Sequence, residues 1–220
     1  MDNRLKRFFQ LQSVLAACCI SCLVLLACRI KLSGSIAYIF MAWNLFLACV
    51  PMVFAILLRY FSPKNNALCA GLFVLWLLFF PNATYMISDL LHLTHLRSAL
   101  IPGWYDAIML FFYALTGLFL GLVSLNYVHV YLKTVFSSEW SWIIVSCSIL
   151  LSGFGVYLGR FLRWNSWDVI SHPLGLFQDV VDRITHPTAH FQTYFVTIVF
   201  TAILFFAYLL FDLSKEREPS

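Results

Sequence analysis

Six long apolar runs dominate this chain and constrain its fold more than any other feature. They cover about residues 8–28, 36–58, 67–93, 105–132, 142–162 and 191–211. About 20 apolar residues cross a bilayer as a helix, and a backbone in lipid must satisfy its own hydrogen bonds. The runs show no strand-like alternation, which excludes a membrane barrel. We therefore predict an all-α membrane protein, a six-transmembrane-helix bundle that forms a single domain over residues 1–220.

The composition excludes other classes of protein. The residues AVILMFWYC make up 62% of the chain and DEKR 11%, against roughly 45–50% and 25% in soluble domains, so a soluble monomer is excluded. The net charge of +4 is small and scattered, which favours the lipid bilayer rather than nucleic acid as a partner. The seven cysteines lie in or beside apolar runs without paired CxxC spacing, so we interpret them as small buried hydrophobes.

The distribution of Lys and Arg predicts the orientation in the membrane. With the N-terminus inside, eight of these residues fall on the cytoplasmic side and six on the outer side. The ratio becomes eight to four if Arg160 and Arg163 belong to a site rather than to a loop. Because positive charge accumulates on the cytoplasmic side of membrane proteins, we expect both termini in the cytoplasm.

The third run is interrupted. Residues 67–80 form only about 21 Å of helix, less than the roughly 30 Å apolar core of a bilayer, and Pro81 follows. We expect a helix broken at Pro81 and restarted with Asn82 as its cap. The break indicates either freed backbone groups that line a cavity or a helix that ends early.

Other patterns predict how the helices pack. Small residues at helical spacing in the fourth and fifth runs favour close helix approach: Gly117, Gly121, Ser148, Ser152, Gly155 and Gly159. Leu174, Phe177, Val181 and Ile184 recur at helical spacing before the last run and predict an interfacial amphipathic helix. Asn44, with Pro51 after it, either extends a polar site inward or marks a kink, and we favour the kink.

Ionisable side chains gather at the predicted outer ends of the third to sixth spans. Asp89, His92 and Asp106 are candidate catalytic acids or bases, because partly desolvated carboxylates and imidazoles titrate near neutrality. Arg160 and Arg163, three residues apart, are candidates for clamping an anion. The alternatives are arginines that extend to headgroups, or an ion pair of Arg160 with Asp89 or Asp106.

The remaining candidate substrate-binding residues flank these charges: Asn82, Tyr85, Trp164, Asn165, Trp167 and Asp168. Asp89, His92 and His95 share one helix face and could take a metal with Asp168 or His172. Their spacing lacks the character of a specific metal motif, so we predict no metal site. The sequence identifies no cofactor. We interpret His129 and His190, near the ends of spans, as interface residues.

The motifs in these segments resemble those of a known family. They are Phe79-Phe80-Pro81-Asn82-Ala83-Thr84-Tyr85 followed by Ser88-Asp89-Leu90, Trp104-Tyr105-Asp106, and the segment from Gly159 to Asp168. They are similar to the bacterial integral-membrane family catalogued as domain of unknown function number thirteen sixty-one. The family pattern reads FPNAPY with a following TDL, so Thr84 replaces a proline and Ser88 a threonine here. The resemblance implies a multi-pass protein of the bacterial plasma membrane, and it implies no activity.

Three functional hypotheses follow. The first is a membrane-embedded enzyme that acts at the outer interface on an anionic lipid or lipid-linked substrate. The second is a scaffold or accessory subunit that binds a membrane-protein partner through the outer cluster. The third, a transporter, is disfavoured because the two halves of the chain show no internal repeat.

Overall fold

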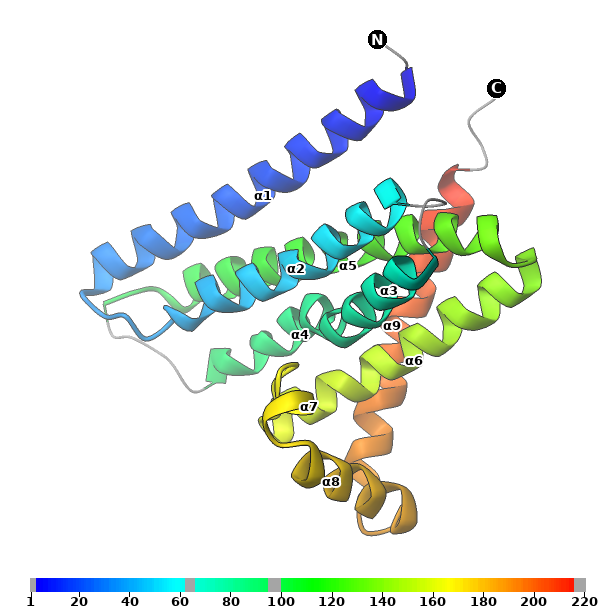
Figure 1. Cartoon of the computed structure of the whole chain (residues 1–220). Coiled ribbons are helices and arrows are strands. Elements are labelled where there is room, and N and C mark those ends of the chain that lie inside the picture. Colours follow the sequence, from blue (N-terminus) through cyan, green and yellow to red (C-terminus); the bar gives the residue numbers. More distant parts are fainter. Residues whose placement is uncertain (1–2, 62–65, 95–99, 216–220) are drawn as a thin grey trace.

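The computed structural model describes residues 3–61, 66–94 and 100–215, and within these ranges it contains helices and no strand (Figure 1). The helices are α1 (Asn3–Ser33), α2 (Phe40–Phe61), α3 (Asn66–Phe79), α4 (Pro81–Ser88), the 3-10 helix η1 (Asp89–Thr94), α5 (Gly103–Val135), α6 (Ser138–Phe161), α7 (Asp168–Ser171), α8 (Pro173–Thr185) and α9 (Phe191–Lys215). Six segments of the described chain are long and apolar enough to cross a membrane: 5–33, 40–61, 67–93, 103–135, 138–161 and 191–215. The prediction of an all-α protein with six spans, the third of them broken, is confirmed.

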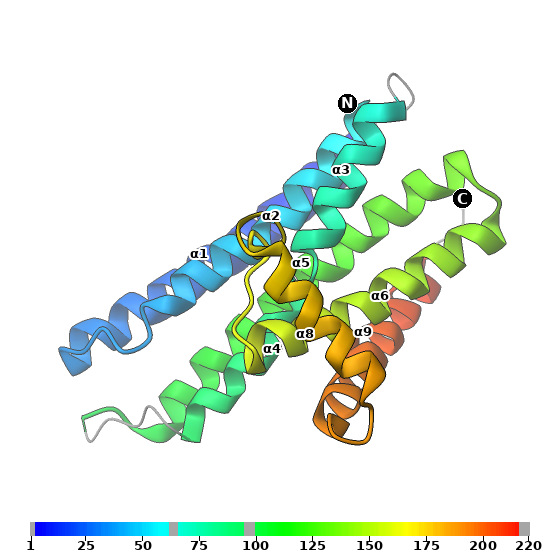
Figure 2. The same cartoon turned by 60° about the horizontal axis from the view of Figure 1, so that its bottom comes forward.

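Helix α5 lies at the centre of the bundle. It contacts α1, α2, α4, α6 and α9, and two views show these helices arranged around it (Figures 1 and 2). Its apolar residues are spread around the whole helix rather than along one stripe, as expected for a helix that is surrounded by others. Helices α1 and α9 lie at the edge and are the least buried spans.

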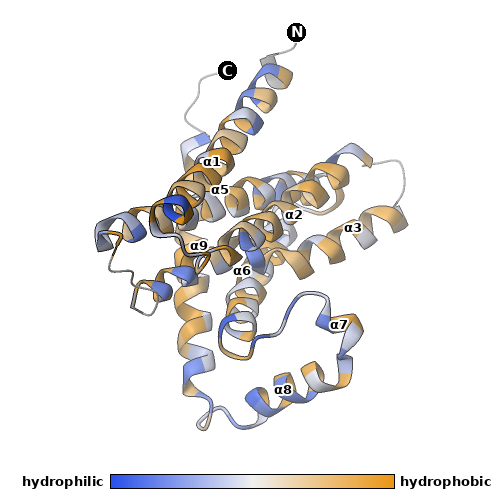
Figure 3. Cartoon of the chain, turned by 90° about the vertical axis from the view of Figure 1, so that its left-hand side faces the viewer, coloured by the Kyte–Doolittle hydropathy of each residue, from blue (hydrophilic) through white to orange (hydrophobic). Residues whose placement is uncertain are grey.

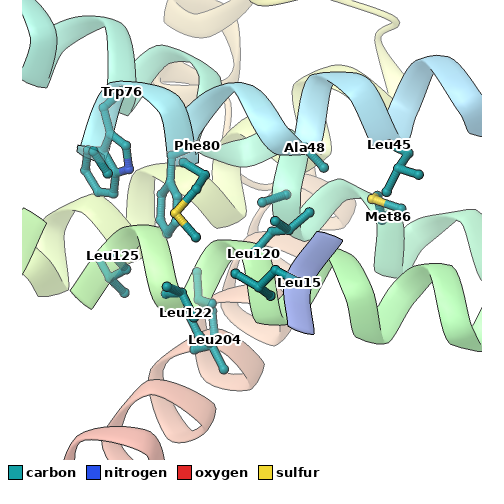
Figure 4. Close-up of a cluster of buried hydrophobic side chains, with 14 of the residues drawn as sticks. Leu15, Leu45, Ala48, Trp76, Phe80, Met86, Leu120, Leu122, Leu125 and Leu204 are labelled. Atoms are coloured by element: carbon teal, nitrogen blue, oxygen red, sulfur yellow. The ribbon is translucent and has the colours of Figure 1, made fainter. Parts of the chain in front are cut away.

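The core holds the broken span against its neighbours (Figure 4). The rings of Trp76 and Phe80 stack with their centroids 4.6 Å apart at the end of α3. Leu45, Ala48 and Met86 are buried in the same cluster, between α2, α4 and α5. Because these side chains come from both sides of the break, the core fixes α3 and α4 in place relative to α2 and α5.

At the break, a side chain next to Pro81 hydrogen-bonds to a backbone carbonyl at the end of α3. Pro81 has no N–H, and the Asn82 side-chain amide donates a hydrogen bond to the Phe79 carbonyl at 2.9 Å. The prediction that Asn82 caps the restarted helix is wrong, because Phe80 occupies the N-cap position and Pro81 begins the helix. Asn82 instead satisfies the end of the preceding helix. Its amide also donates to the Ser166 hydroxyl at 2.9 Å, which ties the break to the segment after α6.

The predicted ridges of small residues hold α4 in place. A Cβ atom on Gly117 of α5 would lie 2.5 Å from the Ala83 carbonyl oxygen of α4. A Cβ atom on Gly155 of α6 would lie 2.6 Å from Pro81 Cγ. On the same side of α6, the Ser152 and Thr84 hydroxyls lie 2.9 Å apart. The close approach that the sequence predicted is therefore made by α5 and α6 to the short helix α4.

Helix α8 is the predicted amphipathic helix, and His172-Pro173 and His186-Pro187 bracket it. It lies beyond the ends of α6 and α9, with hydrophilic and hydrophobic residues interspersed along it (Figure 3). Leu174, Phe177 and Ile184 are exposed on its surface. Its placement along a membrane interface stays a prediction.

Candidate functional site

Asp89 and Arg160 form a buried ion pair at the end of the bundle opposite the termini. Asp89 is the first residue of η1 and has no solvent exposure, whereas Arg160, in the last turn of α6, keeps 11% of its side chain exposed. Arg160 Nη2 donates to Asp89 Oδ1, and the Asn44 amide of α2 donates to Oδ2 at 2.9 Å. Of the two partners predicted for Arg160, Asp89 is confirmed and Asp106 is not. Asn44 extends the polar site rather than only marking a kink.

Three further side chains complete the coordination of the Arg160 guanidinium. Nε donates to the Ser88 hydroxyl at 2.8 Å, Nη1 lies 2.9 Å from His92 Nε2, and Cζ lies 4.3 Å from the centroid of the Tyr85 ring. Arginine only donates hydrogen bonds, so His92 Nε2 accepts and its imidazole carries the proton on Nδ1. Asn44, Tyr85, Ser88, Asp89, His92 and Arg160 are hereafter the Asp89 cluster. Within it, every polar group of Arg160 has a partner.

Asp106 lies apart from this cluster. Its carboxylate accepts from Arg29 Nε at 3.1 Å and from Arg29 Nη2 at 3.4 Å. The Arg29 side chain is only 1% exposed and stacks 4.5 Å from the centroid of the Tyr38 ring. The prediction that Asp106 acts together with Asp89 is therefore not supported by the geometry. Asp106 instead joins the start of α5 to the end of α1 through Arg29.

Asp168 organises the segment after α6. Its carboxylate accepts hydrogen bonds from the Asn165 backbone N–H at 2.7 Å, the Asn165 amide at 3.1 Å and the Ser171 hydroxyl at 2.9 Å. These hydrogen bonds, above all that from the Asn165 backbone, hold the pKa of the Asp168 carboxyl below its usual value. Asp168 thus fixes the path of the chain around residues 165–171 rather than pairing with a cation of the Asp89 cluster.

The prediction that Arg160 and Arg163 form a clamp on one helix face is wrong. Helix α6 ends at Phe161, and Arg163 lies beyond it with a φ of 63°, in the left-handed region. The N–H of Trp164 still bonds to the Leu158 carbonyl at 3.1 Å, so the chain turns sharply at Arg163. The Arg163 side chain is exposed. Because helical spacing does not continue past Phe161, it cannot align the two guanidiniums.

The two tryptophans of this segment have different contacts. Trp164 Nε1 donates to Asp179 of α8 at 2.7 Å, and its ring lies where a Cβ on Gly175 would approach within 3.2 Å. Trp167 packs edge-on against Trp43 of α2, with centroids 6.4 Å apart. Residues 164–167 therefore connect α8 on one side with α2 on the other.

A cavity of about 370 Å³ lies beneath this segment, between α2, α3, α4 and α6. Its polar lining comes from Asn44, Asn82, Tyr85, Asn165 and Ser166, with the indoles of Trp43, Trp164 and Trp167. Its apolar lining includes Val74, Leu77, Leu151 and Phe154. The described residues that line it include Asn44 and Tyr85 of the Asp89 cluster, but not Asp89, His92 or Arg160. The Asp89–Arg160 ion pair is therefore adjacent to the cavity but does not line it.

Most of the polar residues that line the cavity were predicted from the sequence, and two were not. Asn82, Tyr85, Trp164, Asn165 and Trp167 all line the cavity. Asn44 was interpreted as a kink residue, and Ser166 carries no signal beyond its position among predicted residues. The signal that could have found Arg29 is a carboxylate in the first turn of a span, because Asp106 needs a cation at the same depth.

The structure bears on the metal hypothesis as well. Within residues 3–61, 66–94 and 100–215, no group of three or more His, Cys, Asp or Glu side chains is arranged to hold a metal ion. Both Asp89 oxygens are engaged by Arg160 and Asn44. His95, which the hypothesis included, lies outside the described residues.

Comparison with known proteins identifies one matching family model. The model is described as "Protein of unknown function (DUF1361)" and matches residues 43–207, three quarters of the chain. The matched region contains the whole Asp89 cluster and every residue that lines the cavity. No curated protein and no solved structure matches the chain.

Proposed function

The chain belongs to the DUF1361 family of proteins of unknown function, and we propose that this multi-pass membrane protein binds an uncharged amphiphile, a lipid or lipid-linked molecule, in the cavity beside the Asp89 cluster. The observation that carries the proposal is the division of the cavity into a polar and an apolar part. Ligand pockets of this size are mostly apolar, with a few polar groups that set the orientation of the ligand.

The apolar part of the cavity suits a hydrocarbon chain. Val74 of α3 and Leu151 of α6 line it, and both are more than half exposed on the outside of the bundle. In a membrane protein such exposed apolar side chains face lipid tails. A ligand tail could therefore leave the cavity between α3 and α6 and enter the bilayer without crossing a polar surface.

The polar part suits a head group without net charge. The described lining residues include amides, hydroxyls and indoles but no Lys, Arg, His, Asp or Glu. Asp89 and Arg160, which do not line the cavity, neutralise each other in an ion pair. An anion placed there would lose its hydration without gaining a cationic partner, which is costly in an apolar environment. We therefore replace the anionic ligand expected from the sequence with an uncharged one.

The same geometry weighs against the expected acid and base roles of Asp89 and His92. A catalytic group must come within hydrogen-bond reach of the substrate. Neither side chain lines the cavity, and His92 Nε2 is engaged by Arg160. Catalysis at this site would first require the ion pair to separate. The scaffold alternative gives the cavity no role, and a transport path would need polar side chains deeper in the bundle.

A matched pair of neighbouring leucines tests the proposal. Leu151 lines the cavity and is 51% exposed, whereas Leu150 is 48% exposed and does not line it. A Leu151→Trp variant should fill the apolar part and lower the lipid that co-purifies with the protein by about tenfold, the effect of roughly 1.4 kcal/mol of steric conflict. Leu150→Trp should retain lipid as the unmodified protein does. The measurement is mass spectrometry of lipid extracted from protein purified in mild detergent.

Two results of that experiment would contradict the proposal. Equal retention by the Leu151→Trp and Leu150→Trp proteins would show that the cavity holds no lipid. A retained lipid with a net negative head group, lost specifically from Leu151→Trp, would show that the head group was assigned wrongly.

We also infer that the termini face the cytoplasm, in the plasma membrane of a bacterium. At the end of the bundle opposite the termini, Arg29, Arg160 and Arg183 are each neutralised by an ion pair within 4 Å. At the end that holds both termini (Figure 1), Lys133 and Lys215 form no ion pair with a described carboxylate. Lys6 and Arg59 at that end also make no ion pair with a described carboxylate, whereas at the opposite end this holds for Lys31 and Arg163. Among the described residues, more positive charge without an ion pair lies at the end with the termini, as expected of a cytoplasmic face.

A single introduced cysteine tests this orientation. Ser137 lies in the exposed turn between α5 and α6, at the same end as the termini. A membrane-impermeant maleimide should label Ser137→Cys in inverted membrane vesicles and leave it unlabelled in intact cells. Cells of a strain with the unmodified chain give the background from the seven native cysteines. Labelling of Ser137→Cys in intact cells above that background would reverse the orientation.

A further inference from the structure

A second group of polar side chains lies at the end of the bundle that holds the termini, where α5, α6 and α9 meet. His129 of α5 is only 2% exposed, and its Nδ1 lies 2.6 Å from the Tyr208 hydroxyl of α9. Its ring packs edge-on against Trp142 of α6, with centroids 4.6 Å apart. The prediction that His129 is an interface residue is wrong, because the three helices enclose it. The side chains of His129, Tyr208 and Trp142 thus form one aromatic cluster.

Two lysines lie near this aromatic cluster, Lys133 of α5 and Lys215 of α9. Lys133 lies one turn closer to the membrane surface than His129 on α5, and its Nζ is 6.0 Å from the centroid of the Trp142 ring. Lys215, in the last turn of α9, donates to the Asn126 amide oxygen at 2.6 Å and lies 3.8 Å from the Phe211 ring. Both lysines, and Asp212, are near enough to His129 to interact with it electrostatically.

The charges of this group are not balanced within the described chain. Asp212 acts electrostatically on Lys215, and it makes no ion pair within 4 Å with either lysine among the described residues. His129 Nε2 is buried and has no hydrogen-bond partner there. Whichever ring nitrogen carries the proton, the enclosed Nε2 is out of reach of a ligand at the membrane surface. Two ammonium groups beside an indole are the groups that hold a phosphate.

We propose that Lys133 and Lys215, beside Trp142, form a binding site for the phosphate of an anionic phospholipid in the leaflet that faces the termini. The lysines lie at the ends of membrane-spanning helices, at headgroup depth, and the indole of Trp142 is amphipathic and suited to the same depth. Basic pockets between membrane helices bind anionic headgroups in this way. The site is separate from the cavity beside the Asp89 cluster. It binds an anionic ligand, whereas the cavity is proposed to bind an uncharged one.

The test compares lipid retention by the full-length protein in nanodiscs of phosphatidylcholine mixed with phosphatidylglycerol. Native mass spectrometry gives the ratio of the two lipids that remain bound. Each of Lys133→Gln and Lys215→Gln should lower the retained phosphatidylglycerol, relative to phosphatidylcholine, about fivefold, since one lysine near the surface contributes about that factor. Lys31→Gln is the matched control, because Lys31 is also exposed in the last turn of a span but lies at the other end.

Each result either supports the site or overturns it. A loss in both variants but not in Lys31→Gln supports it, and equal ratios in all three variants overturn it. Addition of free glycerol phosphate distinguishes the source of the phosphate. If free glycerol phosphate displaces the bound lipid at concentrations comparable with those of the protein, the ligand is a soluble phosphate and the assignment to a phospholipid is overturned. None of these variants touches the cavity, so the outcome is independent of the Leu151→Trp experiment.

Discussion

Replacing Asp89 with alanine is expected to lower the free energy of unfolding by about 3–5 kcal/mol, because it leaves the Arg160 guanidinium buried without its carboxylate. Arg160 is 89% enclosed, and its remaining partners, Ser88, His92 and Tyr85, carry no negative charge. The Asn44 amide also loses its acceptor. The measurement is unfolding in mixed micelles with increasing SDS, followed by helical circular dichroism.

A double variant separates the loss of the pair from the burial of a lone charge. Asp89→Leu combined with Arg160→Met removes both charges and fills the site with apolar groups, so it should recover most of the lost stability. Asp182→Ala is the control, since the Asp182 side chain is 48% exposed and Arg183 keeps its ion pair with Asp179 at 3.0 Å. If Asp89→Ala and Asp182→Ala unfold alike, the pair does not stabilise the bundle.

The second large effect is expected at Gly117. Gly117→Ala should lower the free energy of unfolding by about 1–3 kcal/mol, because the added Cβ would lie 2.5 Å from the Ala83 carbonyl oxygen and 2.9 Å from Met86 Cβ. The carbonyl belongs to the backbone of α4 and cannot turn aside as a flexible side chain could. Helices α4 and α5 would have to separate, which also shifts the Tyr85 and Ser88 positions of the Asp89 cluster.

Gly71→Ala provides the matched control. Gly71 lies inside α3, and an added Cβ there meets nothing within 4 Å. The same substitution should therefore stabilise the protein by about 0.5–1 kcal/mol through the lower flexibility of alanine in the unfolded chain. The same unfolding measurement applies to both variants. A loss of stability of equal size in Gly117→Ala and Gly71→Ala would show that the effect is not due to the contact with α4.

Most of the fold follows from the sequence because it depends on local properties. The six spans, the break at Pro81 and the amphipathic helix α8 each arise from the composition or periodicity of one continuous segment. Lipid imposes a helix on any sufficiently apolar segment, so no knowledge of neighbouring helices is required. The ridges of Gly117 and Gly155 were found in the same way, but the identity of their common partner, α4, was not.

The candidate site was predicted only in part, because it depends on which helices are neighbours. Asp89 was one of two partners predicted for Arg160, and the structure pairs these two side chains. Asp106 lies on a face of α5 that meets α1, and its partner is Arg29. Arg163 was placed on a helix that ends two residues earlier. Asn82 was predicted to be the N-cap of the helix that follows; it lies inside that helix, and its side-chain amide bonds to the end of the helix before.

By itself, the sequence determined that the chain spans a membrane six times and that its polar chemistry gathers at helix ends, since a charge in lipid is costly wherever it stands. Only the tertiary structure decided which charges cancel. As a result, neutral groups line the cavity, and Lys133 and Lys215 lie without an ion pair at the end of the bundle that holds the termini. The physical reason is that an ion pair requires contact within about 4 Å, and such contacts join residues as far apart in the chain as Arg29 and Asp106. Helix packing sets those contacts, and no single segment encodes them.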